Sequence, residues 1–223
     1  MRRKVPVFVA PALLAATVAF PAQDNGGLLG WVEDTRGVPV AGAVISLFGK
    51  GVGASGLVTP RFVMDLAARL RAGGRAVPIL IDSRYALTRY RRLTACTPNE
   101  SEVEQVLGVI IDDQLSVLER AGRELLKRTG MACVLITRGS RGMALFEPGK
   151  KTVHIPIFGS DQIADVTGAG DTVMATMTLA LAAGGTFEEA ARLANYAGGL
   201  VVMKRGTATV SAAELRRAIG ADV

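Results

Sequence analysis

Apolar side chains recur at helical spacing over most of the chain beyond residue 58. Phe62, Leu66 and Leu70 stand four residues apart, after a Thr-Pro pair typical of a helix N-cap and first turn and before a Gly-Gly pair that ends the run. The same kind of spacing predicts further helices. They cover residues 97–108, residues 112–129, the run straight after DVTGAGD, residues 186–203 and a last stretch from about residue 211.

Short apolar runs between these helices predict strands. AVPILID and MACVLITRG are nearly continuous apolar runs, as expected for strands of a parallel sheet that is covered on both faces. GMALFEPGKKTVHIPI predicts a β-hairpin that turns at its Pro-Gly pair. The Arg- and Tyr-rich stretch before TPNESE is predicted to be a loop. Alternating strands and helices predict an α/β fold with right-handed crossovers, in which ligands bind beyond the carboxyl ends of the strands.

The stretch DVTGAGD, residues 165–171, lies at such an end, as do TRGSRG and TPNESE, so the three polar motifs are expected to meet in one cleft. At a helix start, the N–H groups of Gly168, Ala169 and Gly170 would point at one spot and, with the helix dipole, favour a negative charge. A carboxylate at Asp171 could take a proton from a hydroxyl that attacks a phosphate held there. The stretch suits an ordinary loop-to-helix turn equally well.

Composition narrows the possible partners. The chain has 223 residues, of which 49% are apolar, enough for a sizeable buried core. Its net charge of +6 is modest, and an arginine cluster between residues 84 and 92 is interpreted as a solvated basic loop. Aromatic residues make up 5% of the chain, too few to suggest stacking on single-stranded nucleic acid. We therefore expect no nucleic-acid partner.

The cysteines and the single histidine give no sign of a metal or redox site. Cys96 and Cys133 form no CxxC motif and have no histidine partners, so we expect buried thiols in a reducing compartment and neither zinc nor a disulfide. His154 alternates with Val153 and Ile155 and is expected on the polar side of a strand, outside any catalytic machinery.

The first 56 residues follow a different pattern. Residues 1–22 hold three basic residues and then an apolar run, the layout of a secretory signal, and two prolines argue against a stable membrane span. Residues 23–56 predict a short β-rich segment with a strand, a turn and a second strand. GWVEDTRGVPVAGAVI resembles the start of a carboxypeptidase regulatory-like β-sandwich module, without the later strands of such a module. Residues 57–223 form the predicted α/β domain.

DVTGAGD resembles the carboxy-terminal signature D-x-T-G-A-G-D of the ribokinase-like (PfkB) carbohydrate kinases, and the flanking motifs keep the order of that family. The likeness is strongest to the heptose 7-phosphate kinases of ADP-heptose synthesis, through TPNESEVEQVLG, ITRGSRGMALFEPGK and NYAGGLVVMKRGTATV. The resemblance implies a three-layer α/β/α fold of which this chain carries the C-terminal, nucleotide-binding part. Residues 1–56 do not match the sugar-binding half of such kinases, so we expect that half to be missing.

The resemblance also implies roles for single residues. Asp171 would be the catalytic base, and the N–H groups of Gly168, Ala169 and Gly170 would form the anion hole for the transferring phosphoryl group. Asn99 and Glu102 would organise Mg²⁺ and its waters, although this pair suits a simple helix cap as well. Nucleotide contacts would come from the strand end after MACVLIT, the adenine pocket and the KRGT segment. These residues are Thr137, Gly139, Gly142, Asn195, Lys204, Gly206 and Thr207.

We therefore expect an ATP-dependent sugar kinase that acts on a heptose phosphate, with Mg²⁺ and, as in some family members, a monovalent cation. Two other interpretations stay open: a nucleotide-binding chain without transfer activity, and an exported β-sandwich module based on residues 1–48. ATP chemistry predicts a cytoplasmic protein, whereas the signal-like leader leaves export open. A homodimer or a complementing partner chain is compatible with these expectations.

Overall fold

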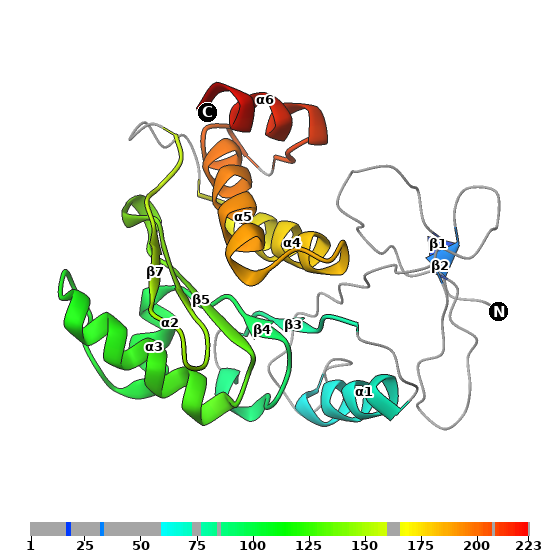
Figure 1. The fold of residues 1–223 in the computed structure, drawn as a ribbon, viewed down its shortest axis with the longest axis vertical. Helices are drawn as coiled ribbons and strands as arrows, with labels where there is room; N and C mark the ends of the chain where they lie inside the picture. Colours follow the sequence, from blue (N-terminus) through cyan, green and yellow to red (C-terminus); the bar gives the residue numbers. More distant parts are fainter. Residues whose placement is uncertain are drawn as a thin grey trace.

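A five-stranded mixed sheet with helices on both faces forms the centre of the protein in the computed structural model (Figure 1). The structure describes residues 59–72, 77–83, 86–159, 166–206 and 208–222, and the backbone of residues 17–18 and 32–33. Near the N-terminus, β1 (Thr17–Val18) pairs antiparallel with β2 (Val32–Glu33). The other residues of the predicted leader and of the predicted strand-turn-strand segment lie outside the described residues.

The strands follow one another across the sheet in the order β3-β4-β5-β6-β7. They are β3 (Leu80–Ile81), β4 (Ala95–Cys96), β5 (Cys133–Thr137), β6 (Met143–Phe146) and β7 (Val153–Ile155). β3, β4 and β5 are parallel, whereas β5, β6 and β7 are antiparallel. The predicted hairpin is confirmed, and the parallel arrangement applies to the first three strands of the sheet.

β4 corrects the sequence prediction, which assigned this stretch to a loop. Its two residues are too few to give a periodic signal, and its place between β3 and β5 comes from backbone hydrogen bonds to both neighbours. The Thr94 N–H donates to the Ile79 carbonyl (2.9 Å), and the Cys133 N–H donates to the Thr94 carbonyl (3.0 Å). Cys96 and Cys133 are free and buried as expected, and burial raises the pKa of both thiols far above the ordinary range.

Helices cover both faces of the sheet, which confirms the expected three-layer α/β/α arrangement (Figure 1). One buried cluster lies between the sheet and the first three helices, and a second lies between the sheet and α4 and α5. No helix in the described part of the chain is long and apolar enough to cross a bilayer. The helices are α1 (Pro60–Ala72), α2 (Glu100–Leu107), α3 (Leu115–Thr129), α4 (Ala169–Ala182), α5 (Phe187–Val202) and α6 (Ala212–Asp222).

Local signals set the helix ends. The Thr59 hydroxyl accepts a hydrogen bond from the Phe62 N–H (3.1 Å), which confirms the predicted N-cap of α1. Gly108 and Gly130 end α2 and α3 in the left-handed conformation, with φ of 68° and 62°, which satisfies carbonyl groups of the last turn. α3 begins at Leu115 rather than at residue 112 as predicted.

Two helical glycines differ in the space around them, and this difference predicts opposite effects of alanine. A Cβ atom at Gly122 of α3 would lie 2.4 Å from Cζ of the fully buried Phe146, whereas a Cβ atom at Gly220 of α6 would meet no atom within 4 Å. We expect Gly122→Ala to lower the free energy of unfolding by about 1–3 kcal/mol through overpacking. Gly220→Ala should raise it by about 0.5–1 kcal/mol.

Chemical denaturation of both variants and the wild type measures this difference. Gly220→Ala is the matched control, because the substitution and the secondary structure are the same in both variants. An unchanged midpoint for Gly122→Ala would show that the Phe146 ring can move aside without cost.

Candidate functional site

The first turn of α4 carries the residues predicted to form an anion hole. Gly168 is the N-cap with φ of 79° and ψ of 5°, and Ala169, Gly170 and Asp171 form the first helical positions. Asp171 is exposed. The Ala169 N–H donates to the Val166 carbonyl (3.2 Å), so this group is already engaged within the loop. The N–H groups of the following two residues have no carbonyl partner within the helix, because a helix begins with unpaired N–H groups.

Asp82 lies beside this turn and is not among the site residues predicted from the sequence. It follows β3 directly, and its Oδ2 atom lies 4.0 Å from the position that a Cβ atom on Gly170 would occupy. The carboxylate therefore stands at the mouth of α4, at the carboxyl edge of the sheet. The available signal was an acid placed directly after the apolar run of AVPILID.

The carboxyl ends of β4 and β5 bring two further predicted segments together. Asn99 and Thr137 form an isolated parallel β-bridge, and the Thr137 N–H donates to the Pro98 carbonyl (2.9 Å). Asn99 belongs to the segment predicted to organise the metal, and Thr137 to the segment predicted to contact the nucleotide. The predicted metal-organising segment and the predicted nucleotide-contacting segment therefore lie side by side at this edge of the sheet.

Asn99 and Glu102 form a capping box at the start of α2. The Asn99 Oδ1 atom accepts from the Glu102 N–H (2.9 Å), and the Glu102 Oε2 atom accepts from the Asn99 N–H (3.1 Å). Glu102 is buried, with 8% of its surface exposed. The helix-cap interpretation of the sequence is confirmed, and any metal role would use the atoms that the cap leaves over.

The loop after β5 contains two glycines with different surroundings. Gly139 has φ of 57° and a Cβ atom there would meet nothing within 4 Å. Gly142 has φ of 78°, and a Cβ atom there would lie 2.1 Å from the Ile155 carbonyl oxygen. Close packing against the end of β7 therefore accounts for the glycine at position 142. The open backbone at Gly139 could approach a ligand.

A network of ion pairs fixes the same loop. Arg138 Nε lies 2.8 Å from Glu100 Oε1, and the two side chains are 8% and 12% exposed. Arg141 Nη2 lies 2.5 Å from Glu100 Oε2, and Nη1 of this arginine contacts Asp113 and donates to the Asp112 carbonyl (3.0 Å). One carboxylate at the start of α2 thus holds both arginines of TRGSRG.

Asn195 makes its contact at the same edge of the sheet, where the end of β7 lies beside the start of β6 and the end of β5. It is buried in α5, with 6% of its surface exposed, and its Nδ2 atom donates to the Pro156 carbonyl (2.8 Å) just after β7. This bond holds the chain after β7 against α5. The adenine-pocket role that the resemblance implies for Asn195 stays a prediction.

The KRGT segment is tied to the start of α6. Lys204 Nζ lies 2.7 Å from Glu214 Oε1 and donates to the Thr209 carbonyl (2.6 Å). The hydrogen bond from Lys204 and those from Ser211 lower the pKa of the Glu214 carboxyl to about 2. Gly206 has φ of 69°. Thr207, the last residue of the predicted nucleotide set, lies outside the described residues.

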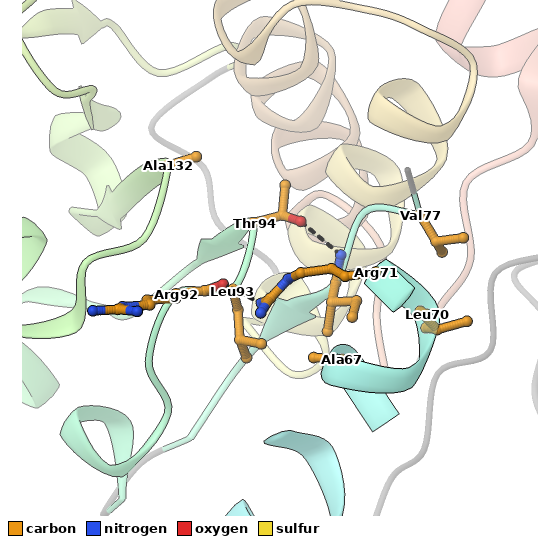
Figure 2. Close-up of a pocket in the computed structure, with 9 residues that line it drawn as sticks. Ala67, Leu70, Arg71, Val77, Arg92, Leu93, Thr94 and Ala132 are labelled. Carbon is orange, nitrogen blue, oxygen red and sulfur yellow. Dashed lines mark hydrogen bonds between the residues drawn. The ribbon is translucent and has the colours of Figure 1, made fainter. Parts of the chain in front are cut away.

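A cavity of about 200 Å³ lies at the opposite edge of the sheet (Figure 2). Several of its lining residues directly precede β3, β4 and β5, so the cavity sits at the amino ends of these strands. Arg71 Nη2 donates to the Arg92 carbonyl (2.5 Å) across it. The cavity is therefore separate from the predicted site. Its lining residues are Ala67, Leu70, Arg71, Val77, Ile79, Arg92, Leu93, Thr94 and Ala132.

The basic loop and the histidine agree with their predictions. Arg91 and Arg92 are exposed, as expected for a solvated basic loop, and Arg84 lies outside the described residues. His154 is exposed on β7, with its Nε2 atom 3.3 Å from Glu119 Oε1. Among the described residues there is no cluster of three or more His, Cys, Asp or Glu side chains that could hold a metal.

The sequence of residues 54–214 matches the family described as pfkB family carbohydrate kinase. The chain belongs to this family. Two relatives named "Bifunctional protein HldE" are similar to it. The protein from Geobacter sulfurreducens is 43% identical over 168 residues, covering 74% of this chain and 33% of the relative. The protein from Nitrosococcus oceani is 42% identical over 200 residues, covering 89% of this chain and 39% of the relative. The chain, as a member of the pfkB family, spans about a third of the length of these two relatives.

Solved structures confirm the ribokinase-like fold. Arabidopsis thaliana ribokinase, complexed with ribose and ATP, has a TM-score of 0.61 and 24% identity, and the match covers 73% of this chain and 53% of that one. Phosphofructokinase-2 from Escherichia coli, in complex with potassium, has a TM-score of 0.63 and 20% identity, with 74% and 53% covered. At these identities the likeness concerns the fold.

The two glycines of the loop after β5 should respond differently to alanine. Gly139→Ala introduces a positive φ at a non-glycine residue without a clash, and should cost about 1 kcal/mol of unfolding free energy. Gly142→Ala adds a clash with the Ile155 carbonyl oxygen and should cost about 3 kcal/mol or more. Denaturant unfolding compares the two variants, and equal losses would show that the β7 backbone yields to the added methyl group.

Removal of the Glu100 carboxylate should also destabilise the loop. Glu100→Ala leaves the buried Arg138 guanidinium without its partner and should lower the unfolding free energy by about 3 kcal/mol. Glu188→Ala is the control, because Glu188 pairs with Arg192 on the surface of α5, where such a pair contributes less than about 1 kcal/mol. Similar losses of unfolding free energy in both variants would contradict the larger contribution expected of the buried pair of Glu100 and Arg138.

Proposed function

We propose that the chain binds ATP and transfers its γ-phosphoryl group to a hydroxyl group of a sugar, with a heptose 7-phosphate as the substrate. The observation that carries the proposal is the first turn of α4. It presents the exposed Asp171 carboxylate next to backbone N–H groups, beside Asp82 at the carboxyl edge of the sheet. Membership of the pfkB family supports the same reaction class.

In the proposed reaction, Asp171 acts as general base. Its carboxylate accepts the proton of the sugar hydroxyl while the hydroxyl oxygen forms a bond to the γ-phosphorus of ATP. The bond between the γ-phosphorus and the bridging oxygen breaks, so that ADP takes the electron pair and leaves. An exposed carboxylate in the first turn of a helix suits this step, because a substrate can reach it from the sheet edge.

The N–H groups at the start of α4 would stabilise the charge on the transferring phosphoryl group. Gly168 and Gly170 have no side chain that could keep a phosphate away from the backbone, and no atom lies within 4 Å of a Cβ position on Gly168. The Ala169 N–H donates to the Val166 carbonyl, so it would contribute only by sharing that bond. The proposed anion hole therefore relies mainly on the neighbouring N–H groups, those of Gly168 and Gly170.

The donor set at the sheet edge fits a hydrated Mg²⁺ ion, which binds through one or two carboxylates and substrate phosphates and keeps several waters. Asp82 and Glu102 would supply these carboxylates. When bound, the ion neutralises charge on the ATP phosphates. Because the Asn99 Oδ1 atom already accepts a bond in the cap, the Asn99 side-chain N–H groups would donate to a ligand oxygen instead.

The nucleotide would extend from the phosphate site along the loop after β5 toward α5. Gly139 offers an open backbone there, and Thr137 ends the strand next to Asn99. Adenine contact by Asn195, closure of the base site by Lys204, Gly206 and Thr207, and a monovalent cation near that segment are part of the proposal on the strength of the family resemblance.

The sugar substrate follows from the likeness to heptose 7-phosphate kinases and from the relatives named HldE. Because this chain spans about a third of those relatives, the sugar, a cytoplasmic location and a homodimer or complementing chain are all proposals.

Asp171→Asn tests the proposed reaction. We expect the wild type to release ADP from ATP and heptose 7-phosphate, and the variant to lose about a hundredfold to ten-thousandfold in rate, because the amide cannot accept the proton. Titration calorimetry should show nucleotide binding by both proteins. Asp65→Asn is the control, because it makes the same substitution at an exposed residue of α1 outside the proposed site. Asp65 Oδ2 lies 4.0 Å from Arg61 Nε.

The outcomes separate the candidate functions. Saturable ATP binding without ADP release by the wild type would identify a nucleotide-binding chain that does not transfer phosphate. Equal rates for Asp171→Asn and the wild type would contradict the general-base role. ADP release with ribose in place of heptose 7-phosphate would change the proposed substrate and leave the reaction class unchanged.

A further inference from the structure

The Thr97 hydroxyl is a buried polar group that the fold leaves unsatisfied. Thr97 has 4% of its surface exposed, and its Oγ1 atom has no hydrogen-bond partner among the described residues. It is the one buried side-chain oxygen or nitrogen in the described part of the chain with this property. Such a group costs free energy in the folded protein, so it calls for an explanation such as a ligand.

Strand register places Thr97 on the face that α4 covers. Ala95 packs in the cluster under α4 and α5, whereas Cys96 packs in the cluster on the opposite face. Because side chains alternate between the two faces along a strand, Thr97 returns to the face of Ala95. β3 and β4 pair Leu80 with Ala95 and end one residue later, so the same register carried past the strand ends sets Thr97 opposite Asp82.

Residues beyond β4 keep the same register. The bridge between Asn99 and Thr137 has the same register as the pairing of β4 with β5. The backbone of residues 97–99 therefore continues β4 in an extended conformation. Thr97 is therefore the last buried position on this face before the exposed Asn99. Its neighbour Asp82 lies 4.0 Å from the Cβ position of Gly170 in the first turn of α4.

We propose that Thr97 is a further ligand-binding residue, whose hydroxyl donates a hydrogen bond to a phosphate oxygen of the bound triphosphate. The inference rests on the proposed function and adds a side-chain donor from the sheet to the backbone N–H groups of α4. A neutral hydroxyl suits this place, because the strand register sets Thr97 opposite Asp82 and a hydroxyl can donate to a phosphate without forming an ion pair with that carboxylate.

The hydroxyl is shielded before the ligand binds. Rotation about the Cα–Cβ bond of Thr97 redirects its hydroxyl, and we expect the oxygen to turn toward the phosphate on binding. The unsatisfied hydroxyl of the free chain would thereby gain its partner on binding. A water-mediated contact to the phosphate would have the same donor.

Thr97→Val and Thr97→Ser test the inference. We expect Thr97→Val to raise the dissociation constants of Mg²⁺-ATP and of Mg²⁺-tripolyphosphate about tenfold, because each loses one charge-assisted hydrogen bond. Thr97→Ser keeps the hydroxyl and should bind both ligands like the wild type. Adenosine, which has no phosphate, should bind all three proteins equally in titration calorimetry.

Thermal unfolding without ligand separates a binding role from a structural one. A valine of similar shape removes an unpartnered hydroxyl, so Thr97→Val should not lower the melting temperature. A lower melting temperature together with weaker adenosine binding would overturn the inference in favour of a structural role. Unchanged affinity of Thr97→Val for both phosphate ligands would overturn it as well.

The tripolyphosphate probe distinguishes this inference from the proposed function. If the wild type binds tripolyphosphate but not ATP, the proposed function fails, and the comparison of Thr97→Val with the wild type still decides the role of the hydroxyl. If the wild type binds neither ligand, both the inference and the proposed function are overturned.

Discussion

The packing of α4 against the sheet is the contact on which the candidate site depends. Val173 and Met177 of α4 are buried in one cluster with side chains of β4, β5 and β6, and Val173 meets α5 so closely that a Cβ atom on Gly198 would lie 3.0 Å from it. These contacts lock the helix in place. The first turn, with Gly168 and Asp171, is consequently held at the sheet edge without needing contacts of its own.

The register of the parallel strands supplies the other side of the site. β3, β4 and β5 run in the same direction, so their carboxyl ends reach one edge together. Polar residues follow each strand at that edge, including Asp82, Thr97 and Asn99. The amino ends meet at the other edge, where the cavity of Figure 2 has a largely apolar lining with two arginines. The direction of the strands thus separates the proposed chemistry from the rest of the surface.

Several residues at this edge carry structural contacts beside any proposed role. Asn99 and Glu102 cap α2, Asn195 holds the chain after β7, and Lys204 is tied to α6. Such contacts orient the side chains and also consume some of their hydrogen-bonding capacity. Each residue can offer a ligand only the donor and acceptor groups that these contacts do not use. For Asn99 these are the side-chain N–H groups.

The sequence by itself determined the α/β class, most of the helices, the hairpin and the family signature, because these depend on apolar periodicity and on local turn and cap residues. It also selected Asp171 and the glycines before it as candidate site residues, whose roles are proposals. It missed β4, whose two residues form a strand only through bonds to both neighbours, and it missed Asp82 and Thr97. Only the tertiary structure decided which polar groups become neighbours and which buried hydroxyl lacks a partner. Strand register and helix packing join residues far apart in the chain, and no local pattern records that pairing.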